Sequence, residues 1–544
     1  MPVLPAALFA LPFIFLILFF FLPVGKVLTG GLSLPGLAKI FGNAYYRKVI
    51  GFTIFQALVS TFFSVLLGLP GAYFMANYSF PGKRLVNALS AVPFFLPSIL
   101  AVLGFVLVFG NNGIVNRFLI SLFGGDGPPL KILYSFKAII LAHVFYNFPI
   151  VLRLTGKYWS RIGNLEEKAA SLLGSSPLRT FFKITLPKIA PSIISSAGLI
   201  FIYCFMSFSV ILVLGGGPKY STIEVEIYNL ARSSMDTSVI GNLAFVSILF
   251  SVGFAIFNVY IQKKMASRVT AAERPGYKKL FIKGEGLKST LACFYFAVVL
   301  ALIIGPPLAV IVNSFIAKEG FTAGSHFSLK WYKLIFSGSG GGLGLSGLIN
   351  TVMISLLAML CAASVGLIFS YLSNRVVKKS SALEGLMTLP LSVGSVALGV
   401  GYLSLSSALP DTPLITLIAI AMAHAVTTYP LVMRGLSAFY QGLSGNIFKA
   451  AALAGAGPGK TFLTIDLPLV LKPLLAVSAF AFALSAGEFN ASVILSKGKV
   501  TTIPVLMYRM IGAYNFNGAC AYGTILISLS IILVFALDSN EGLI

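Results

Sequence analysis

Long uninterrupted runs of apolar residues constrain this 544-residue chain more than any other feature of its sequence. A run of about 20 such residues can cross the hydrocarbon core of a bilayer as a helix. Each crossing must be helical, because lipid offers no hydrogen-bond partner to an open backbone. Twelve runs are long enough to span: 6–23, 50–77, 87–110, 133–154, 193–215, 238–261, 290–313, 347–372, 384–408, 413–434, 474–496 and 518–537.

The charged residues are few, and their placement agrees with a membrane protein. Only 10% of the residues are charged and the mean hydropathy is +0.95, whereas soluble chains are about one-quarter charged. Lys and Arg number 39 against 15 Asp and Glu, and they gather between the apolar runs, as they do in cytoplasmic loops. No basic segment alternates with aromatic residues, so we expect this charge to set topology rather than to bind nucleic acid.

The flanks of the first apolar run favour a retained helix over a cleaved signal peptide. No basic residue precedes the run, and it ends at Pro23 rather than at a cleavage site of small residues. Counting helices places most basic loops inside, although Lys26, Arg47 and Lys48 fall in the first outer loop. The sequence therefore predicts an all-α, multi-pass membrane protein.

The chain divides into two related halves. Residues 263–289 are polar and basic, and we expect them to form a cytoplasmic linker between a first repeat at 1–262 and a second repeat at 290–544. An offset of 281 aligns the halves over more than 70 positions. Six helices in each half give a parallel repeat about an axis along the membrane normal. Pairs at this offset include His143 and His424, Pro149 and Pro430, Arg153 and Arg434, and Phe208 and Phe489.

The loop after the fourth run of each half carries one shared pattern. Lys168-Ala-Ala-Ser-Leu-Leu-Gly174 corresponds to Lys449-Ala-Ala-Ala-Leu-Ala-Gly455, and Ile-x-Leu-Pro follows nine residues later. This pattern predicts a short helix, a glycine that ends it in a left-handed cap, and a second helical turn. Such an element suits docking into a groove on a partner, with Phe181 and Phe462 as apolar anchors. The predicted docking residues are Lys168, Ala169, Ala170, Gly174, Phe181, Ile184, Leu186, Pro187, Lys449, Ala450, Ala451, Gly455, Phe462, Ile465, Leu467 and Pro468.

The paired pattern resembles the EAA loop of type I ABC importers, in the frame Ala-Ala-x3-Gly-x9-Ile-x-Leu-Pro. Lys168 and Lys449 replace the leading Glu, so a salt bridge through that Glu is not expected. The resemblance implies the type I importer fold, two copies of a separate ABC ATPase that bind ATP and Mg, and a periplasmic or lipid-anchored substrate-binding protein. Residues 454–461 approach a phosphate-binding P-loop, but Ala454 replaces its first Gly and no buried strand precedes it. We expect no catalytic residue and no cofactor in this chain.

Two stretches, 141–149 and 214–228, resemble segments of thiamine-transport permeases, which are also fused two-half proteins. The resemblance implies import of thiamine or its phosphates by alternating access. Ferric-iron permeases share the fused layout and are the alternative. A secondary transporter driven by an ion gradient also commonly has two six-helix halves, but it has no use for the docking loops. A membrane-embedded enzyme finds no support, because no nucleophile–base set stands out in the sequence.

A few residues in or beside the apolar runs are candidates for the substrate path. Glu488 lies in the eleventh run, where a charge is costly. It either lines the path of a cationic substrate, or it caps backbone or pairs with a Lys or Arg. His143 and His424 favour helix packing through a hydrogen bond over a proton relay. The scattered cysteines indicate neither a disulfide nor a metal site. Candidates for the path or for contact with the binding protein are Glu488, Ser207, Gly215, Gly216, Gly217 and Glu224, the glycines being plain turn residues in the alternative reading.

Overall fold

The computed structural model describes residues 6–233, 236–266, 278–280, 286–318, 325–337, 344–376 and 381–538. Within these ranges, ten helices are long and apolar enough to cross a membrane, and a bent pair adds an eleventh. The apolar helix α28 (Phe516–Asp538) stands at the position of the twelfth predicted run. The prediction of an all-α membrane protein with about twelve crossing helices is confirmed.

The first half begins with the N-terminal span and ends at the basic linker. Its long helices bury small and polar side chains on one face, as α4 does with Thr53, Ser60, Ser64 and Gly68, which lets neighbouring helices approach closely. Its elements are α1 (Ala6–Leu16), η1 (Ile17–Phe21), α2 (Leu22–Gly31), α3 (Leu34–Gly42), α4 (Ala44–Asn77), α5 (Lys83–Leu89), α6 (Val92–Phe95), α7 (Ser98–Phe109), α8 (Ile114–Phe123), α9 (Phe136–Ile150), η2 (Val151–Thr155), α10 (Gly156–Trp159), α11 (Leu165–Leu172), α12 (Pro177–Thr180), η3 (Phe181–Thr185), α13 (Leu186–Phe205), α14 (Ser209–Leu214), η4 (Pro218–Tyr220), α15 (Ile223–Ser233) and α16 (Thr237–Ala266).

The second half repeats this order with different loops. Most of the predicted linker, residues 267–277 and 281–285, lies outside the described residues. The short strands β1 (Tyr78–Ser79) and β2 (Lys278–Lys279) pair in parallel, and β3 (Ile316–Lys318) and β4 (Ser325–Phe327) pair antiparallel. The helices are α17 (Gly286–Ser314), α18 (Lys330–Ser337), α19 (Leu345–Tyr371), η5 (Leu372–Val376), α20 (Ser381–Thr388), η6 (Leu389–Ser392), α21 (Ser395–Ser406), α22 (Pro413–Gly442), α23 (Gly445–Leu453), α24 (Pro458–Thr461), η7 (Phe462–Asp466), α25 (Leu467–Ala486), α26 (Asn490–Leu495), α27 (Ile503–Gly512) and α28.

Two predicted spans of each half are broken helices. The ninth span bends by 88° between Leu383–Ser392 and Ser395–Ser406. The third span, its counterpart, is divided at Pro97 before α7 begins. The fifth and eleventh spans start earlier than the apolar runs predict, and they stop before the short helices α14 and α26. Each break leaves backbone groups in the interior that side chains must satisfy.

Contacts at equivalent positions show that the two halves are repeats in space as well as in sequence. The hydroxyl of Thr53 accepts a hydrogen bond from the Ile223 N–H at 3.1 Å, and Thr351 accepts one from Ile503 at 2.8 Å. Phe208 and its equivalent Phe489 stack against each other, with ring centroids 5.9 Å apart. The pseudo-two-fold axis therefore passes between these two rings.

The first span of each half packs against the other half. Helix α2 lies along α21, and α17 lies along α7. The hydroxyl of Tyr402 on α21 donates to the carbonyl of Phe19 at 2.7 Å, and the absence of a side chain at Gly401 lets Pro23 approach. Gly104 on α7 meets Pro306 of α17 in the corresponding way. The division at 1–262 and 290–544 remains a prediction about the sequence repeats, because each first span packs against both halves in space.

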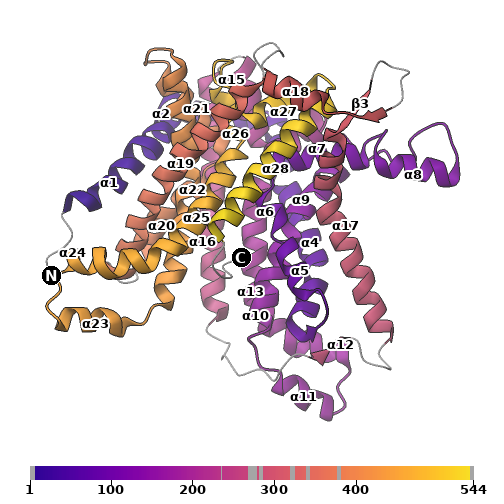
Figure 1. The fold of residues 1–544 in the computed structure, drawn as a ribbon, viewed down its shortest axis with the longest axis vertical. Helices are drawn as coiled ribbons and strands as arrows, with labels where there is room; N and C mark the ends of the chain where they lie inside the picture. Colours follow the sequence, from indigo (N-terminus) through magenta and orange to yellow (C-terminus); the bar gives the residue numbers. More distant parts are fainter. Residues whose placement is uncertain are drawn as a thin grey trace.

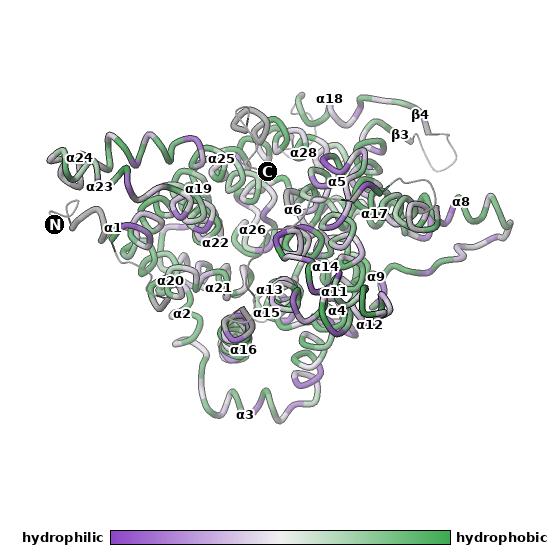
Figure 2. Tube along the Cα trace, turned by 90° about the horizontal axis from the view of Figure 1, so that it is seen from below, coloured by the Kyte–Doolittle hydropathy of each residue, from purple (hydrophilic) through white to green (hydrophobic). Residues whose placement is uncertain are grey.

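The molecule has two distinct ends. In Figure 1, α11, α12 and α23 lie in the lower part of the molecule, where α16 ends and α17 begins, and α24 lies above α23 at the left edge, beside the N-terminus. The β3–β4 ribbon, α15, α18 and α27 lie at the opposite, upper end. Figure 2 shows α3 and α8 extending from the rim of the bundle. Since the basic linker joins α16 to α17, we assign the lower end to the cytoplasm.

Candidate coupling elbows and substrate path

The repeated loop forms two helix–break–helix elements, which we call the first elbow (α11 to α12, 165–180) and the second elbow (α23 to α24, 445–461). Gly174 and Gly455 end the leading helices with φ angles of +78° and +75°. These angles lie in the left-handed region that glycine adopts without strain. An added side chain would meet no atom at either position, so the backbone angle alone requires glycine. The predicted left-handed caps are confirmed.

Each elbow is tied to the span that follows it, by different chemistry at equivalent positions. In the first elbow, the carboxylate of Glu167 accepts a hydrogen bond from the Thr185 hydroxyl at 2.7 Å. The offset of 281 relates Glu167 and Thr185 to Phe448 and Asp466 in the second half. In the second elbow, Arg375 bridges these two, because its guanidinium lies 3.4 Å from the Phe448 ring centre and 3.3 Å from the Asp466 carboxylate. Both elbows are therefore anchored, and each moves with its span.

The aromatic residues predicted as anchors for a partner point toward their own halves. Phe181 packs near Trp159, with 6.3 Å between ring centroids, and Phe462 packs on Tyr371 at 4.9 Å. Both are half-buried, so part of each ring stays accessible, and their role as anchors for a partner remains a prediction. An aromatic side chain at the base of an elbow gains more from burial against its neighbour ring than from exposure to water.

Leucines at the elbow tips carry the exposed apolar surface instead. Leu172 is 89% exposed and its repeat equivalent Leu453 is 90% exposed. Leu173 beside the first of these is 88% exposed. Sequence reasoning overlooked this pair, although the offset of 281 relates Leu172 to Leu453 and could have identified it.

The other predicted docking residues divide between the surface and the base of each elbow. They are the lysines, alanines, isoleucines, leucines and prolines that the two copies of the docking pattern share. Ala170 is half-buried while Ala451 is buried, and Ile184, Leu186, Ile465 and Leu467 are half-buried. The exposed residues are Lys168, Ala169, Pro187, Lys449, Ala450 and Pro468.

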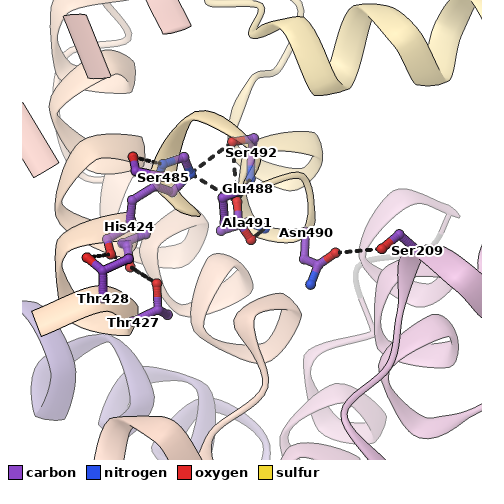
Figure 3. A network of polar contacts seen from close by, with 10 residues as sticks. Ser209, His424, Thr427, Thr428, Ser485, Glu488, Asn490, Ala491 and Ser492 are labelled. Carbon is purple, nitrogen blue, oxygen red and sulfur yellow. Dashed lines mark hydrogen bonds and ion pairs between the residues drawn. The ribbon is translucent and has the colours of Figure 1, made fainter. Parts of the chain in front are cut away.

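The centre of the second half holds a buried polar network (Figure 3). His424 Nδ1 lies 2.8 Å from the Ser485 hydroxyl, and Nε2 lies 3.0 Å from the Ser492 hydroxyl and 2.9 Å from a carboxylate oxygen of Glu488. The same carboxylate accepts the backbone N–H groups of Ala491 and Ser492 at 3.0 and 3.3 Å. Glu488 thus caps the N-terminus of α26, where the helix dipole favours a negative charge. The capping agrees with the structural role weighed from the sequence, whereas the paired side chain is a histidine and not the Lys or Arg named there.

The first half has the equivalent histidine without the acid. His143 lies 2.8 Å from the hydroxyl of Ser207, which stands at the position of Glu488, and 2.9 Å from that of Ser60. These contacts join three spans, as expected for helix packing. Across the axis, the Ser209 hydroxyl donates to the side-chain oxygen of Asn490 at 3.4 Å (Figure 3). Ser209 and Asn490 are themselves equivalent, so this contact joins the halves at the axis.

The outer candidates take different positions. Gly216 and Gly217 are exposed, and both have positive φ angles, of +71° and +108°. Gly215 is buried. Glu224 is 1% exposed, and its carboxylate accepts the N–H groups of Val396 and Ala397 at the start of α21. Contact of Glu224 with a docked protein is therefore corrected to a buried cap that joins α15 of one half to α21 of the other.

Comparisons with known proteins agree with this architecture. The family described as the binding-protein-dependent transport system inner membrane component matches residues 64–267. The thiamine transport system permease protein ThiP of Brucella abortus is 26% identical over 539 residues, covering 95% of each chain. ThiP of Haemophilus influenzae is 26% identical over 528 residues, covering 96% of this chain and 94% of that relative.

A shorter relative matches only about half of this chain. The transport system permease protein PhnU of Salmonella typhi is 28% identical over 274 residues, which are 49% of this chain but 92% of PhnU. This chain is therefore about two such permeases in length, in agreement with the internal repeat. Residues 64–267 match the inner membrane component family, and nearly the whole chain is similar to ThiP permeases, in agreement with an importer permease whose two halves are fused in one polypeptide.

Proposed function

We propose that this permease passes thiamine or its phosphates from a periplasmic or lipid-anchored binding protein to the cytoplasm by alternating access. Two copies of a separate ABC ATPase, which bind ATP and Mg, drive it, one at each elbow. The observation that carries this proposal is the pair of elbows at one end of the molecule, each with an exposed leucine at its tip (Figure 1). Exposed apolar tips at two equivalent positions suit two identical partners.

The elbows are continuous with the centre of the bundle. Helical residues run without interruption from Pro177 to Phe205 and from Gly459 to Ala486. At 1.5 Å per residue, each forms a lever of about 40 Å. The first lever ends beside Ser207 and Phe208, and the second ends beside Glu488 and Phe489. Movement of the ATPases would therefore reach the contacts on the pseudo-two-fold axis as rigid-body rotation of the halves.

The substrate assignment draws on the relatives that match nearly the whole chain. ThiP proteins from Brucella abortus and Haemophilus influenzae have the same fused length and are named for thiamine transport. The first test is uptake of labelled thiamine by proteoliposomes that contain the permease, the ATPase and the binding protein. We expect uptake that requires hydrolysable ATP and the binding protein. Uptake driven by an ion gradient without the ATPase would refute the proposal, and ATP-dependent uptake of Fe³⁺ instead of thiamine would favour the ferric-iron alternative.

A further inference from the structure

A cavity of about 390 Å³ opens at the end of the molecule opposite the elbows. We call it the outer pocket. Its walls come from α15 of the first half and from α21, α26 and α27 of the second, which gather at the upper end in Figure 1. Tyr228 and its repeat equivalent Tyr508 line it and hydrogen-bond to each other, so the pocket lies at the junction of the halves. This volume is within the range of about 300–1,000 Å³ found for small-molecule sites.

Three basic side chains line the outer pocket: Arg232, Lys497 and Arg509. All three are exposed to solvent. A guanidinium nitrogen of Arg232 donates to the Tyr228 hydroxyl at 3.3 Å, which fixes one side of the group. Among the described residues that line the pocket, none is acidic. Three like charges around one cavity repel each other unless an anion lies between them.

Two acidic residues, on the loop before α22 and at the start of α26, already have partners. Asp411 lies close enough to interact with Lys497, but its carboxylate is 2.6 Å from the ammonium of Lys499. The hydrogen bond from Lys499 lowers the pKa of Asp411, so this carboxylate stays ionised and paired. Glu488, at the start of α26, has its oxygens bound to His424 and to the helix N-terminus. Neither acid neutralises the pocket.

The backbone at Lys497 supplies an independent argument. Lys497 has a φ angle of +41°, and Gly498 after it has +81°. The same turn in the first half is made by Gly216 and Gly217, at +71° and +108°. A lysine in the left-handed region costs free energy that glycine does not. The second half therefore keeps a strained lysine where its own repeat uses glycine, as residues at ligand sites do.

We propose that the outer pocket binds an oxyanion with more than one negative charge, of the phosphate or pyrophosphate class, held by Arg232, Lys497 and Arg509. Guanidinium groups bind such oxygens in pairs, and the lysine adds a compact charge. The oxyanion is either free in the outer medium or the phosphoryl group of an esterified cargo. Only the second source rests on the proposed function.

The first experiment uses the full-length permease in nanodiscs and inorganic pyrophosphate as the probe, in isothermal titration calorimetry at low salt. We expect Lys497→Gly to weaken binding by about tenfold or more, because it removes one charge-assisted bond. This variant copies the first half and relieves strain, so it keeps the fold. Arg509→Gln should weaken binding similarly. The control is Lys219→Gln, which changes an exposed lysine in the equivalent first-half turn, outside the pocket. No pyrophosphate binding by the wild type, or equal binding by Lys497→Gly, would overturn the proposal.

The second experiment separates the two sources. In proteoliposomes, uptake of thiamine and of thiamine pyrophosphate is compared between the wild type and Lys497→Gly. A selective loss of pyrophosphate-ester uptake identifies the cargo as the source. Equal uptake by both proteins, with pyrophosphate binding weakened, identifies a free anion. Equal loss of both substrates together with weaker binding of the receptor protein would contradict the proposal and assign the basic residues to receptor docking. Absence of any thiamine uptake would refute the proposed function and leave the calorimetric result standing.

Discussion

Removing the leucine side chains at the elbow tips should detach the ATPase without harming the permease. Leu172 and Leu453 are 89% and 90% exposed, so nearly their whole side chains are available for burial in a partner. Leu→Ala removes apolar groups worth about 2 kcal/mol on burial, or about a 30-fold loss of affinity at each elbow. In the double variant each of the two elbows should lose about 2 kcal/mol, or about 4 kcal/mol over both ATPase copies. Exposed substitutions change folding stability by only about 0.5 kcal/mol.

The assay is the affinity of the ATPase for the permease in nanodiscs, measured by thermophoresis beside thermal unfolding of the same samples. Leu122→Ala on α8 is a matched control, because this leucine is 61% exposed at the opposite end of the molecule. It should leave ATPase affinity unchanged. Unchanged affinity in the Leu172→Ala, Leu453→Ala double variant would refute the assignment of the tips. A large fall in its unfolding temperature would show that the leucines stabilise the permease itself.

Three further substitutions test the parts that hold the elbows and the centre. Gly174→Ala should cost about 1 kcal/mol, because φ is +78° there; unfolding of the purified permease measures this, and no change would contradict the left-handed cap. Arg375→Ala leaves the carboxylate of Asp466, 2% exposed, without its partner and should cost about 3–5 kcal/mol; limited proteolysis should then cut the second elbow before the first, and equal cutting argues against the anchor. Glu488→Gln should lower the unfolding temperature but leave the thiamine concentration for half-maximal uptake unchanged; the reverse outcome would make Glu488 a substrate contact.

Much of the fold follows from the sequence, because lipid permits few alternatives. An apolar run must be helical in hydrocarbon, so all twelve runs correspond to helices or bent helices. The helix–break–helix form of each elbow was also predictable, from its glycine. A glycine after a short Ala-rich segment, as at Gly174 and Gly455, is the usual end of a helix in the left-handed region.

The breaks within spans were not predictable from hydropathy. Residues 193–215 form one apolar run, yet the helix stops at Phe205 and restarts at Ser209. A side chain far away in the sequence supports the equivalent break in the second half, where His424 pairs with Glu488, the residue that caps α26. The packing of each first span against both halves leaves no local signal in the sequence either.

Which side chains of the elbows are exposed was likewise not predictable from the sequence. An apolar pattern does not say which side of a helix faces the parent protein, so Phe181 was an equal candidate with Leu172. Phe181 turns inward because it packs against a cluster of buried residues from other segments, Ala76, Trp159, Ile162 and Ile189. The repeat itself held information that single positions lack, since Leu172 and Leu453 share the offset and the exposure.

The most direct test of the central claim is cysteine cross-linking of both elbows in the assembled transporter. Ala169→Cys and Ala450→Cys are exposed, equivalent positions, to be introduced singly after replacement of the native cysteines. We predict that each forms a cross-link to an ATPase subunit, and that a membrane-impermeant thiol reagent added outside intact cells labels neither. Labelling from outside, or cross-links at neither elbow, would contradict the coupling role.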